Sequence, residues 1–384
     1  MIVMNLKVDN LCGFRSFSIN FSYPKKVVHS SIPEEYLEGR PNFRYQKAII
    51  LMGTNASGKT SIGKIIMAIF NFLCRQDIPQ MIALVGHKAN PAYAQMDFVI
   101  KEMLYRIMIR IDPVFDENKK PVNSTISASL QKTDIGIRDN YEICSQRLDS
   151  ENPDFITDYV KLQKEIPNFG WYFTYPEDGN ENAIPISKKS SIFPEVLKEV
   201  LMTMDQAITN VRPLEHVDST YLIQSSNLDD TIILKDGKIL KADRQRLSSG
   251  TIHGFQVAAI MSALLEHQNG FYFCDELFSY TASDIEKACL SVMVQCLGKN
   301  EQLFFTTHNQ EILTLPYPKH SFVFLSKEKV DQEVYAKPYK ASDFLKKQSD
   351  SVKNAADNDL FSAAPDLNPI FDLEKLNQAE NENE

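Results

Sequence analysis

Eight consecutive residues with the pattern G-x-x-x-x-G-K-[ST] are the part of this sequence best suited to chemistry. They are Gly53, Thr54, Asn55, Ala56, Ser57, Gly58, Lys59 and Thr60. The apolar run 48–52 before them predicts a buried strand, and residues 61–70 predict the start of a helix. In that setting the loop amides face phosphates, Lys59 reaches the β- and γ-phosphates, and the Thr60 hydroxyl coordinates Mg²⁺. We therefore predict that this P-loop, together with Ser61, binds a nucleotide.

Three polar segments further along the chain flank apolar runs. Residues 247–251, Leu-Ser-Ser-Gly-Thr, precede a helix-like stretch at 252–266, and alone they would be a turn that caps a helix. Residues 270–276 predict a buried strand that ends on two adjacent carboxylates, and residues 302–309 predict another that ends near a histidine. Ligands of open parallel sheets bind outside the carboxyl ends of the strands. We expect these segments to share one site with the P-loop.

In this order, the P-loop, Leu-Ser-Ser-Gly, strand-Asp-Glu and strand-Thr-Thr-His resemble the ABC-type ATPases. Within this group the sequence resembles the SMC-like branch, which includes chromosome-structure, double-strand-break-repair and OLD-type ATPases. It implies an α/β fold, a P-loop NTPase of ABC type whose mixed β-sheet is flanked by helices and carries an inserted lid. It also implies that the chain binds ATP and Mg²⁺ and hydrolyses ATP.

The resemblance implies roles that spacing alone does not show. Ser248, Ser249 and Gly250, here called the signature, would act in trans on a nucleotide held by another protomer. A homodimer or higher homo-oligomer is therefore expected.

The resemblance also assigns the residues that follow the two predicted strands. Asp275 would support Mg²⁺ through water, Glu276 would polarise the attacking water, and His308 would be the switch histidine near the γ-phosphate. These roles meet the needs of phosphoryl transfer, which are positioning and neutralisation of charge.

The N-terminus provides a weaker match. The segment 13–17, Gly-Phe-Arg-Ser-Phe, resembles a loop with which SMC-like proteins often begin. By that resemblance Arg15 and Ser16 are candidates to contact the nucleotide, whereas the two phenylalanines suit the core. The family also has a glutamine that contacts the metal, and Gln95 is our candidate for it.

The net charge of −9 is concentrated at the C-terminus. From residue 357 onward there are eight acids and one base, which leaves the rest of the chain with 40 bases and 42 acids. We find no dense Lys/Arg cluster interleaved with aromatic residues, so a built-in nucleic-acid platform is not supported. No apolar run approaches the ~18 residues of a membrane helix, and the start lacks the features of a signal peptide. We expect a cytoplasmic protein without a membrane partner.

The six cysteines contain no C-x-x-C pair. Their spacing indicates reduced, buried thiols, and neither a disulfide framework nor a zinc site is expected.

The motifs divide the chain into four parts. Residues 1–112 would form the N-terminal half of the ATPase core, 113–241 the inserted lid, 242–348 the C-terminal half, and 349–384 an acidic tail that is disordered or docks on a partner. The lid segment is too short for the long coiled coil of SMC proteins and has no sustained heptad pattern. Within it, residues 194–209 predict a helix and residues 232–240 a β-hairpin around Asp-Gly.

Compact ATPases with these motifs resemble the ATPase subunits of bacterial anti-phage systems, such as the Septu, PARIS and retron-associated types. That resemblance implies a subunit that holds or activates a separate nuclease or toxin, with DNA or a phage protein as the trigger. The alternative is an SMC-like repair or recombination ATPase that acts directly on DNA. A scaffold that binds ATP and turns it over slowly also stays open, whereas the signature and the long insertion disfavour a transporter subunit.

Overall fold

The structure is a computed structural model that describes residues 1–25, 30–175, 190–229, 231–330, 333–347, 349–363 and 367–371. Two of the segments discussed above lie outside the described residues. They are residues 176–189 of the expected lid and, in the acidic tail, residues 364–366 and 372–384.

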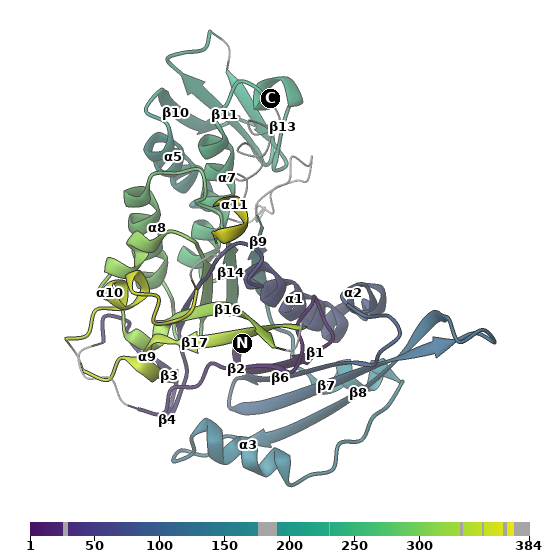
Figure 1. The fold of residues 1–384 in the computed structure, drawn as a ribbon. Coiled ribbons are helices and arrows are strands. Elements are labelled where there is room, and N and C mark those ends of the chain that lie inside the picture. Colours follow the sequence, from purple (N-terminus) through teal and green to yellow (C-terminus); the bar gives the residue numbers. More distant parts are fainter. Residues whose placement is uncertain are drawn as a thin grey trace, which may run out of the picture.

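A six-stranded mixed sheet forms the centre of the molecule (Figure 1). Its order is β17-β16-β5-β15-β14-β9, with parallel pairing throughout except between β16 and β17. The strands are β5 (Ala48–Met52), β9 (Trp171–Thr174), β14 (Phe271–Asp275), β15 (Gln302–Thr306), β16 (Phe322–Val330) and β17 (Glu333–Lys340). The strands predicted before the P-loop, the two acids and the histidine are confirmed as β5, β14 and β15.

Alternate side chains of the central strands enter two different cores. In β5, Ile49 and Leu51 belong to one cluster, whereas Ile50 and Met52 belong to the other. This period of two is what a strand buried on both faces requires, and it explains why β5 reads as a continuous apolar run.

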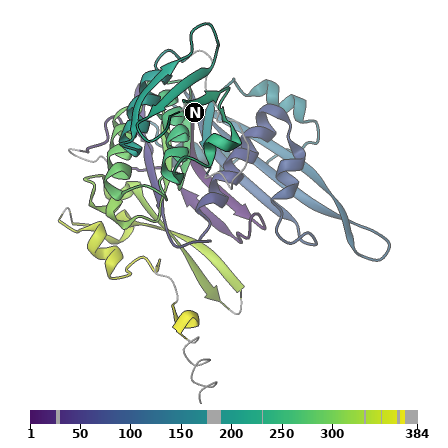
Figure 2. The same cartoon turned by 90° about the horizontal axis from the view of Figure 1, so that it is seen from above.

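The first core lies between the central sheet and a second, antiparallel sheet of order β2-β1-β6-β7-β8. Between the sheets lies α1, whose Gly63 approaches β14 so closely that a Cβ would stand 2.5 Å from the Phe273 ring. The β7–β8 ribbon extends away from the side that carries α8 and α10 (Figures 1 and 2). The elements of this half are β1 (Ile2–Asp9), β2 (Phe17–Asn20), α1 (Lys59–Arg75), α2 (Ile78–Ala83), β6 (Ala92–Ile100), β7 (Met103–Phe115), β8 (Pro121–Asp134), α3 (Tyr141–Asp149) and α4 (Tyr159–Glu165).

The second core lies under helices on the opposite face of the central sheet. There α5 packs on α7, and a small sheet of order β10-β11-β12-β13 adjoins them. The predicted hairpin is confirmed as β12–β13, whereas the predicted helix 194–209 ends at Met204 and residue 208 begins β10. The elements are α5 (Phe193–Met204), β10 (Ile208–Pro213), β11 (Thr220–Ser225), β12 (Ile232–Lys235), β13 (Lys238–Ile239), α6 (Lys241–Arg244), α7 (Ser249–Leu265) and α8 (Ser283–Gln295).

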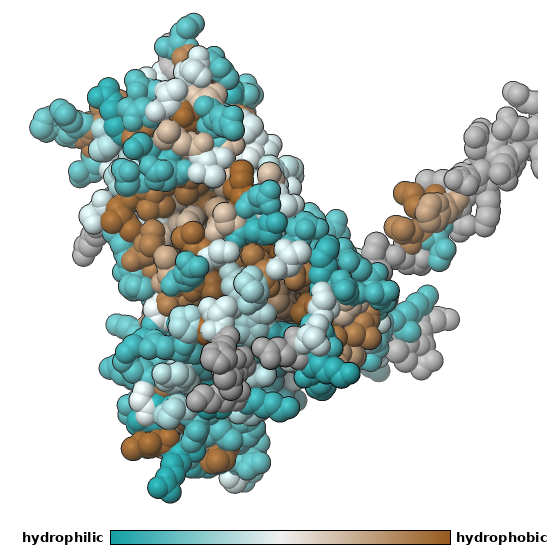
Figure 3. Space-filling model, turned by 90° about the vertical axis from the view of Figure 1, so that its left-hand side faces the viewer, coloured by the Kyte–Doolittle hydropathy of each residue, from teal (hydrophilic) through white to brown (hydrophobic). Residues whose placement is uncertain are grey.

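Short elements complete the described chain. They are β3 (Tyr36–Leu37), β4 (Arg40–Arg44), the 3₁₀ turns Gln310–Thr314 and Lys319–Ser321, α9 (Ala341–Phe344), α10 (Val352–Asp357) and α11 (Asn368–Phe371). None of the described helices is long and apolar enough to span a membrane. Figure 3 shows the side of the molecule that carries α5 and α8, where apolar side chains gather across the middle between more hydrophilic ends.

The segment 113–241 is continuous with the core sheets. Residue 113 lies inside β7, and β8 completes the antiparallel sheet. Strand β9, from the same segment, pairs in parallel with β14 at the edge of the central sheet. The expected boundary between residues 112 and 113 therefore cuts through β7. The expected lid also contains a strand of the central sheet, β9, which could not be recognised locally because its partner β14 lies far away in the sequence.

The beginning of the expected acidic tail packs on the core. Residues 352–357 form α10, and Phe361, which is 1% exposed, stacks on Phe324 with ring centroids 4.0 Å apart. The hydroxyl of Ser326 donates a hydrogen bond to the carbonyl of Ser362. The expectation of disorder is therefore wrong for residues 351–363, whereas docking of the tail on a partner stays a prediction.

All six cysteines are free. Cys144 and Cys274 are buried, as expected, but Cys74 is exposed near the end of α1, which corrects the prediction of uniform burial. Burial raises the pKa of the Cys274 thiol, which keeps it protonated.

Candidate nucleotide-binding site

The P-loop joins β5 to α1, as the sequence predicts, and its two glycines allow close approach. Gly53 and Gly58 have φ angles of 146° and 109°. A Cβ would lie 2.4 Å from the Leu325 carbonyl at Gly53 and 2.6 Å from the Phe14 ring at Gly58. Phe14 is 2% exposed, which confirms its predicted place in the core. The N-terminal loop thus packs against the P-loop through the contact of Phe14 with Gly58.

Lys59 begins α1 with its side chain folded over the loop. Its Nζ donates hydrogen bonds to the carbonyls of Gly53 at 2.8 Å and Thr54 at 3.2 Å. It also forms an ion pair with Glu276 Oε1 at 2.9 Å. The ammonium is therefore fixed at the mouth of the loop, next to the carboxylate predicted to be catalytic.

Thr60 and Asp275 meet directly. Thr60 Oγ1 donates to Asp275 Oδ2 at 2.6 Å, and Thr306 Oγ1 donates to Asp275 Oδ1 at 2.6 Å. The Asp275 side chain is fully buried, and this burial raises its pKa while the bonds from Thr306 and Thr60 oppose the shift. A hydroxyl and a carboxylate are hard oxygen ligands of the kind that Mg²⁺ prefers, so the pair fits the predicted metal.

Glu276 adopts a left-handed backbone conformation, with φ of 41°. Such a conformation costs a non-glycine residue about 1–3 kcal/mol and persists where the surroundings fix it. Here the Glu276 amide donates to Thr306 Oγ1 at 3.0 Å. The turn directs the half-buried carboxylate to Lys59, and Glu276 also lines a cavity of about 200 Å³.

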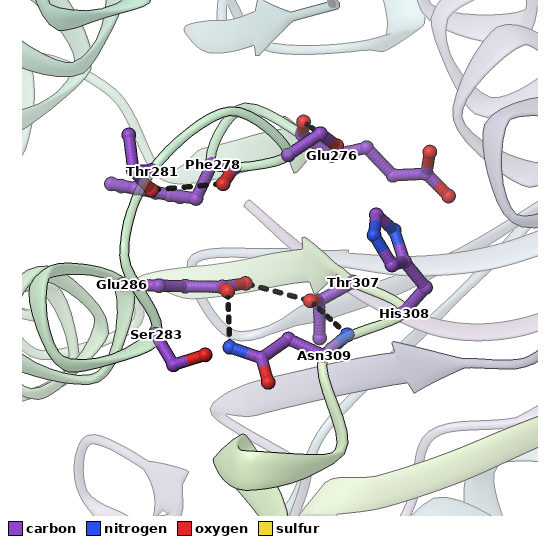
Figure 4. A pocket seen from close by; sticks show the side chains of 9 residues that line it. Glu276, Phe278, Thr281, Ser283, Glu286, Thr307, His308 and Asn309 are labelled. Carbon is purple, nitrogen blue, oxygen red and sulfur yellow. Dashed lines mark hydrogen bonds between the residues drawn. The ribbon is translucent and has the colours of Figure 1, made fainter. Parts of the chain in front are cut away.

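Figure 4 shows that cavity, which lies between the ends of β14 and β15 and the start of α8. The His308 ring points toward Glu276, while its neighbours Thr307 and Asn309 are hydrogen-bonded to Glu286. Glu286 on α8 accepts hydrogen bonds from Thr307 Oγ1 at 2.6 Å and from Asn309 Nδ2 at 2.7 Å.

Glu286 is a functional candidate that the sequence analysis missed. It is 4% exposed, and burial raises its pKa while its bonds to Thr307 and Asn309 oppose the shift. A carboxylate within an amphipathic helix usually faces solvent, so spacing gave no signal of its position. Its bonds fix both neighbours of the exposed His308, and we call this arrangement the Glu286 clamp.

A second cavity, of about 800 Å³, lies on the other side of His308. Residues 53–55 of the P-loop form one wall, and Asp357, Asp359 and Phe361 of the C-terminal segment form another. The P-loop is thus bordered by a part of the chain that the sequence analysis placed outside the core.

The signature lies at the start of α7 and lines neither of the two cavities. Ser248 caps this helix by accepting a hydrogen bond from the Thr251 amide at 3.0 Å, which confirms the predicted capping turn. Ser249 and Gly250 form the first turn. Among the residues that the structure describes, none of the three signature residues lines either cavity.

The two N-terminal candidates have partners of their own. Arg15 forms an ion pair with Glu333 of β17 and contacts His87 Nε2 at 2.9 Å. The Ser16 amide donates to Asp9 Oδ1 at 2.9 Å. Neither residue lines a cavity in the described part of the chain, so their contact with a nucleotide stays a prediction.

Gln95 occupies the middle of β6 and not the metal site. It accepts a hydrogen bond from the Tyr93 hydroxyl at 3.0 Å, and its Nε2 donates to Asp97 Oδ1 at 3.4 Å. These bonds belong to a buried polar network of the antiparallel sheet, in which Arg106 pairs with Asp97. Gln95 is therefore a structural residue in this fold.

The fold is similar to solved structures of SMC head domains. One is a crystal structure of an Smc head bound to the C-winged helix domain of ScpA; it has 11% sequence identity and a TM-score of 0.52, and the match covers 90% of this chain and 100% of that chain. Another is an Smc head domain with an extended coiled coil bound to the C-terminal domain of ScpA, derived from Pyrococcus furiosus. It has 9% identity and a TM-score of 0.51, with coverage of 89% and 97%.

At these identities the likeness shows the fold alone. The chain has the mixed α/β fold of an SMC head, which is an ABC-type ATPase fold. No protein-family model and no curated protein matches the sequence.

The Glu286 clamp predicts a stability effect. Replacing Glu286 with Ala leaves Thr307 and Asn309 without their buried acceptor, so the free energy of unfolding should fall by about 2–4 kcal/mol in urea titrations. Asp284→Ala is the matched control, since its side chain on the same helix is 91% exposed. Equal stability of the two variants would show that the clamp does not hold the His308 segment.

Proposed function

We propose that the chain binds and hydrolyses ATP with Mg²⁺. One observation carries the proposal: three adjacent parallel strands bring the P-loop, the Asp275–Glu276 pair and His308 to the same edge of the central sheet. The direct contacts of Lys59 with Glu276 and of Thr60 with Asp275 join residues that lie far apart in the sequence. Phosphoryl transfer requires such a concentration of donors, cation and carboxylates.

Each side chain has a distinct role in this proposal. The loop amides and Lys59 would bind the phosphates, with Lys59 exchanging its bonds to loop carbonyls for phosphate oxygens. Thr60 and Asp275 would hold Mg²⁺, which when bound neutralises charge on the phosphates. Glu276 would orient the attacking water, and His308 would donate a hydrogen bond toward the γ-phosphate.

Changing Glu276 to Gln should separate binding from turnover. The amide cannot accept the proton of the attacking water, so hydrolysis should slow by at least about 100-fold while ATP still binds. Single-turnover hydrolysis and equilibrium binding measure the two effects. An unchanged rate would remove Glu276 from the catalytic role and favour a scaffold that turns ATP over slowly.

We further propose that two protomers complete each site. In the described chain Ser248 and Ser249 are exposed at the start of α7, Gly250 is half-buried, and none of the three lines either cavity. A second copy, packed around a two-fold axis, would present its signature to the P-loop of the first and receive the same contact in return. Gly250 lies against the Tyr280 carbonyl, where a Cβ would stand at 3.1 Å, so a side chain at this position would be crowded.

Mixing two inactive variants tests this arrangement. Lys59→Ala should lose phosphate binding, and Ser249→Glu should repel the phosphates of the partner's nucleotide. In a 1:1 mixture, half of the dimers are mixed and each has one intact site, so about a quarter of wild-type ATPase activity should return. Each variant alone is the control. A mixture as inactive as its components would contradict completion in trans.

For the biological role we propose an ATPase subunit of a bacterial anti-phage complex, which holds or activates a separate nuclease or toxin. The support is the resemblance of the motif set and the form of the insertion, whose part from residue 190 onward folds as α5 and a small sheet instead of a coiled coil. The Smc heads of similar fold bind a domain of ScpA, and the apolar surface in Figure 3 is suited to a protein partner of this chain.

Capture of partners distinguishes this role from direct action on DNA. A tagged Glu276→Gln chain, which retains ATP, is purified from its native host beside a Lys59→Ala control. We expect a nuclease or toxin in stoichiometric amounts with the first variant and much less with the second. Recovery of DNA with repair proteins would instead favour the repair or recombination ATPase.

A further inference from the structure

Tyr175 directly follows β9, at the carboxyl ends of the strands of the central sheet, where the candidate site also lies. Strand β9 runs parallel to β14, and Thr174 pairs with Cys274. The next residues along the two strands are Tyr175 and Asp275, so the tyrosine stands beside the buried carboxylate. The sequence analysis assigned this tyrosine to the lid and gave it no role.

The aromatic contacts of Tyr175 place it on the face of the sheet that carries α1. Its ring lies 6.1 Å from both Phe173 and Phe273. Phe273 belongs to the core between the central sheet and α1, and Asp275 lies two residues further along the same strand. Residues two apart share a face of a strand, so Tyr175, Asp275 and Thr60 converge on the same side.

The Tyr175 hydroxyl oxygen is shielded from solvent, yet it has no hydrogen-bond partner within the described part of the chain. Burial of an unpaired hydroxyl costs about 1–3 kcal/mol. A phenylalanine would make the same ring contacts without that cost, so packing does not account for the hydroxyl. Burial, and then the charge of Asp275, raise the pKa of Tyr175, which leaves its proton available for donation.

We propose that the Tyr175 hydroxyl is a further part of the nucleotide site, where it donates a hydrogen bond to an oxygen of the bound Mg²⁺–nucleotide complex. That oxygen belongs either to a water on the metal or to a phosphate. The inference rests on the proposed ATP-binding function. It also gives β9 a function, which is to carry a donor to the place where Asp275 and Thr60 would hold the metal.

Calorimetric titration with a non-hydrolysable ATP analogue tests the role of the hydroxyl. The full chain, Tyr175→Phe and Tyr317→Phe are compared with Mg²⁺ and with EDTA. Tyr317 is a matched control because it is half-buried against the core on the other face of the sheet. Loss of one hydrogen bond should raise the Kd of Tyr175→Phe about tenfold with Mg²⁺. Tyr317→Phe should bind as wild type does.

Comparing the affinities of Tyr175→Phe with Mg²⁺ and with EDTA shows which oxygen accepts the hydrogen bond. A weaker affinity only with Mg²⁺ assigns the oxygen to a metal-bound water, and a weaker affinity in EDTA as well assigns it to a phosphate. Equal affinity of Tyr175→Phe and wild type would overturn the inference alone, whereas a wild-type chain that binds no nucleotide would overturn the proposed function too. Because the hydroxyl is unpaired, Tyr175→Phe should melt no lower than wild type. A lower Tm together with weaker binding would indicate a structural role and contradict the proposal.

Discussion

The parallel alignment of β5, β15 and β14 is the constraint on which the candidate site depends. Their carboxyl ends meet at one edge, where Asp275 accepts hydrogen bonds from Thr60 on α1 and from Thr306 on β15. These two bonds connect the P-loop helix to the strand that precedes His308. The close approach of Gly63 to Phe273 keeps α1 against β14, so the positions of Lys59 and Thr60 relative to Asp275 follow from the packing of the core.

Much of this arrangement could be predicted from the sequence, because its signals are local. The run 48–52 is apolar since β5 is buried on both faces, and the glycines at 53 and 58 occur where a Cβ would collide with neighbouring atoms. The segments that end at Glu276 and His308 are likewise short apolar strands followed by polar residues. Their order, through the resemblance to ABC-type ATPases, predicted that these segments share one site, although the signature lines neither cavity in this chain.

Other parts of the site could not be predicted, since they depend on contacts between distant segments. Glu286 reaches Thr307 from a helix whose pattern gives no sign of it. Residues 349–363 have a polar composition, but the stacking of Phe361 on Phe324 fixes them beside the P-loop. The prediction that Gln95 contacts the metal was wrong, because the sequence around a glutamine near a strand does not show which groups its side chain will bond. In the structure it bonds Tyr93 and Asp97.

The origin of β9 has a consequence for protein engineering. Recognition segments of related proteins are often exchanged as cassettes, and 113–241 would be an obvious cassette from motif spacing. That exchange would remove an edge strand of the central sheet, together with the Phe173 and Tyr175 rings that pack on Phe273. A chimaera that replaces only residues 190–241 keeps the sheet complete and transfers α5 with the small sheet beside it. The unit of exchange in this fold is therefore shorter than the insertion itself.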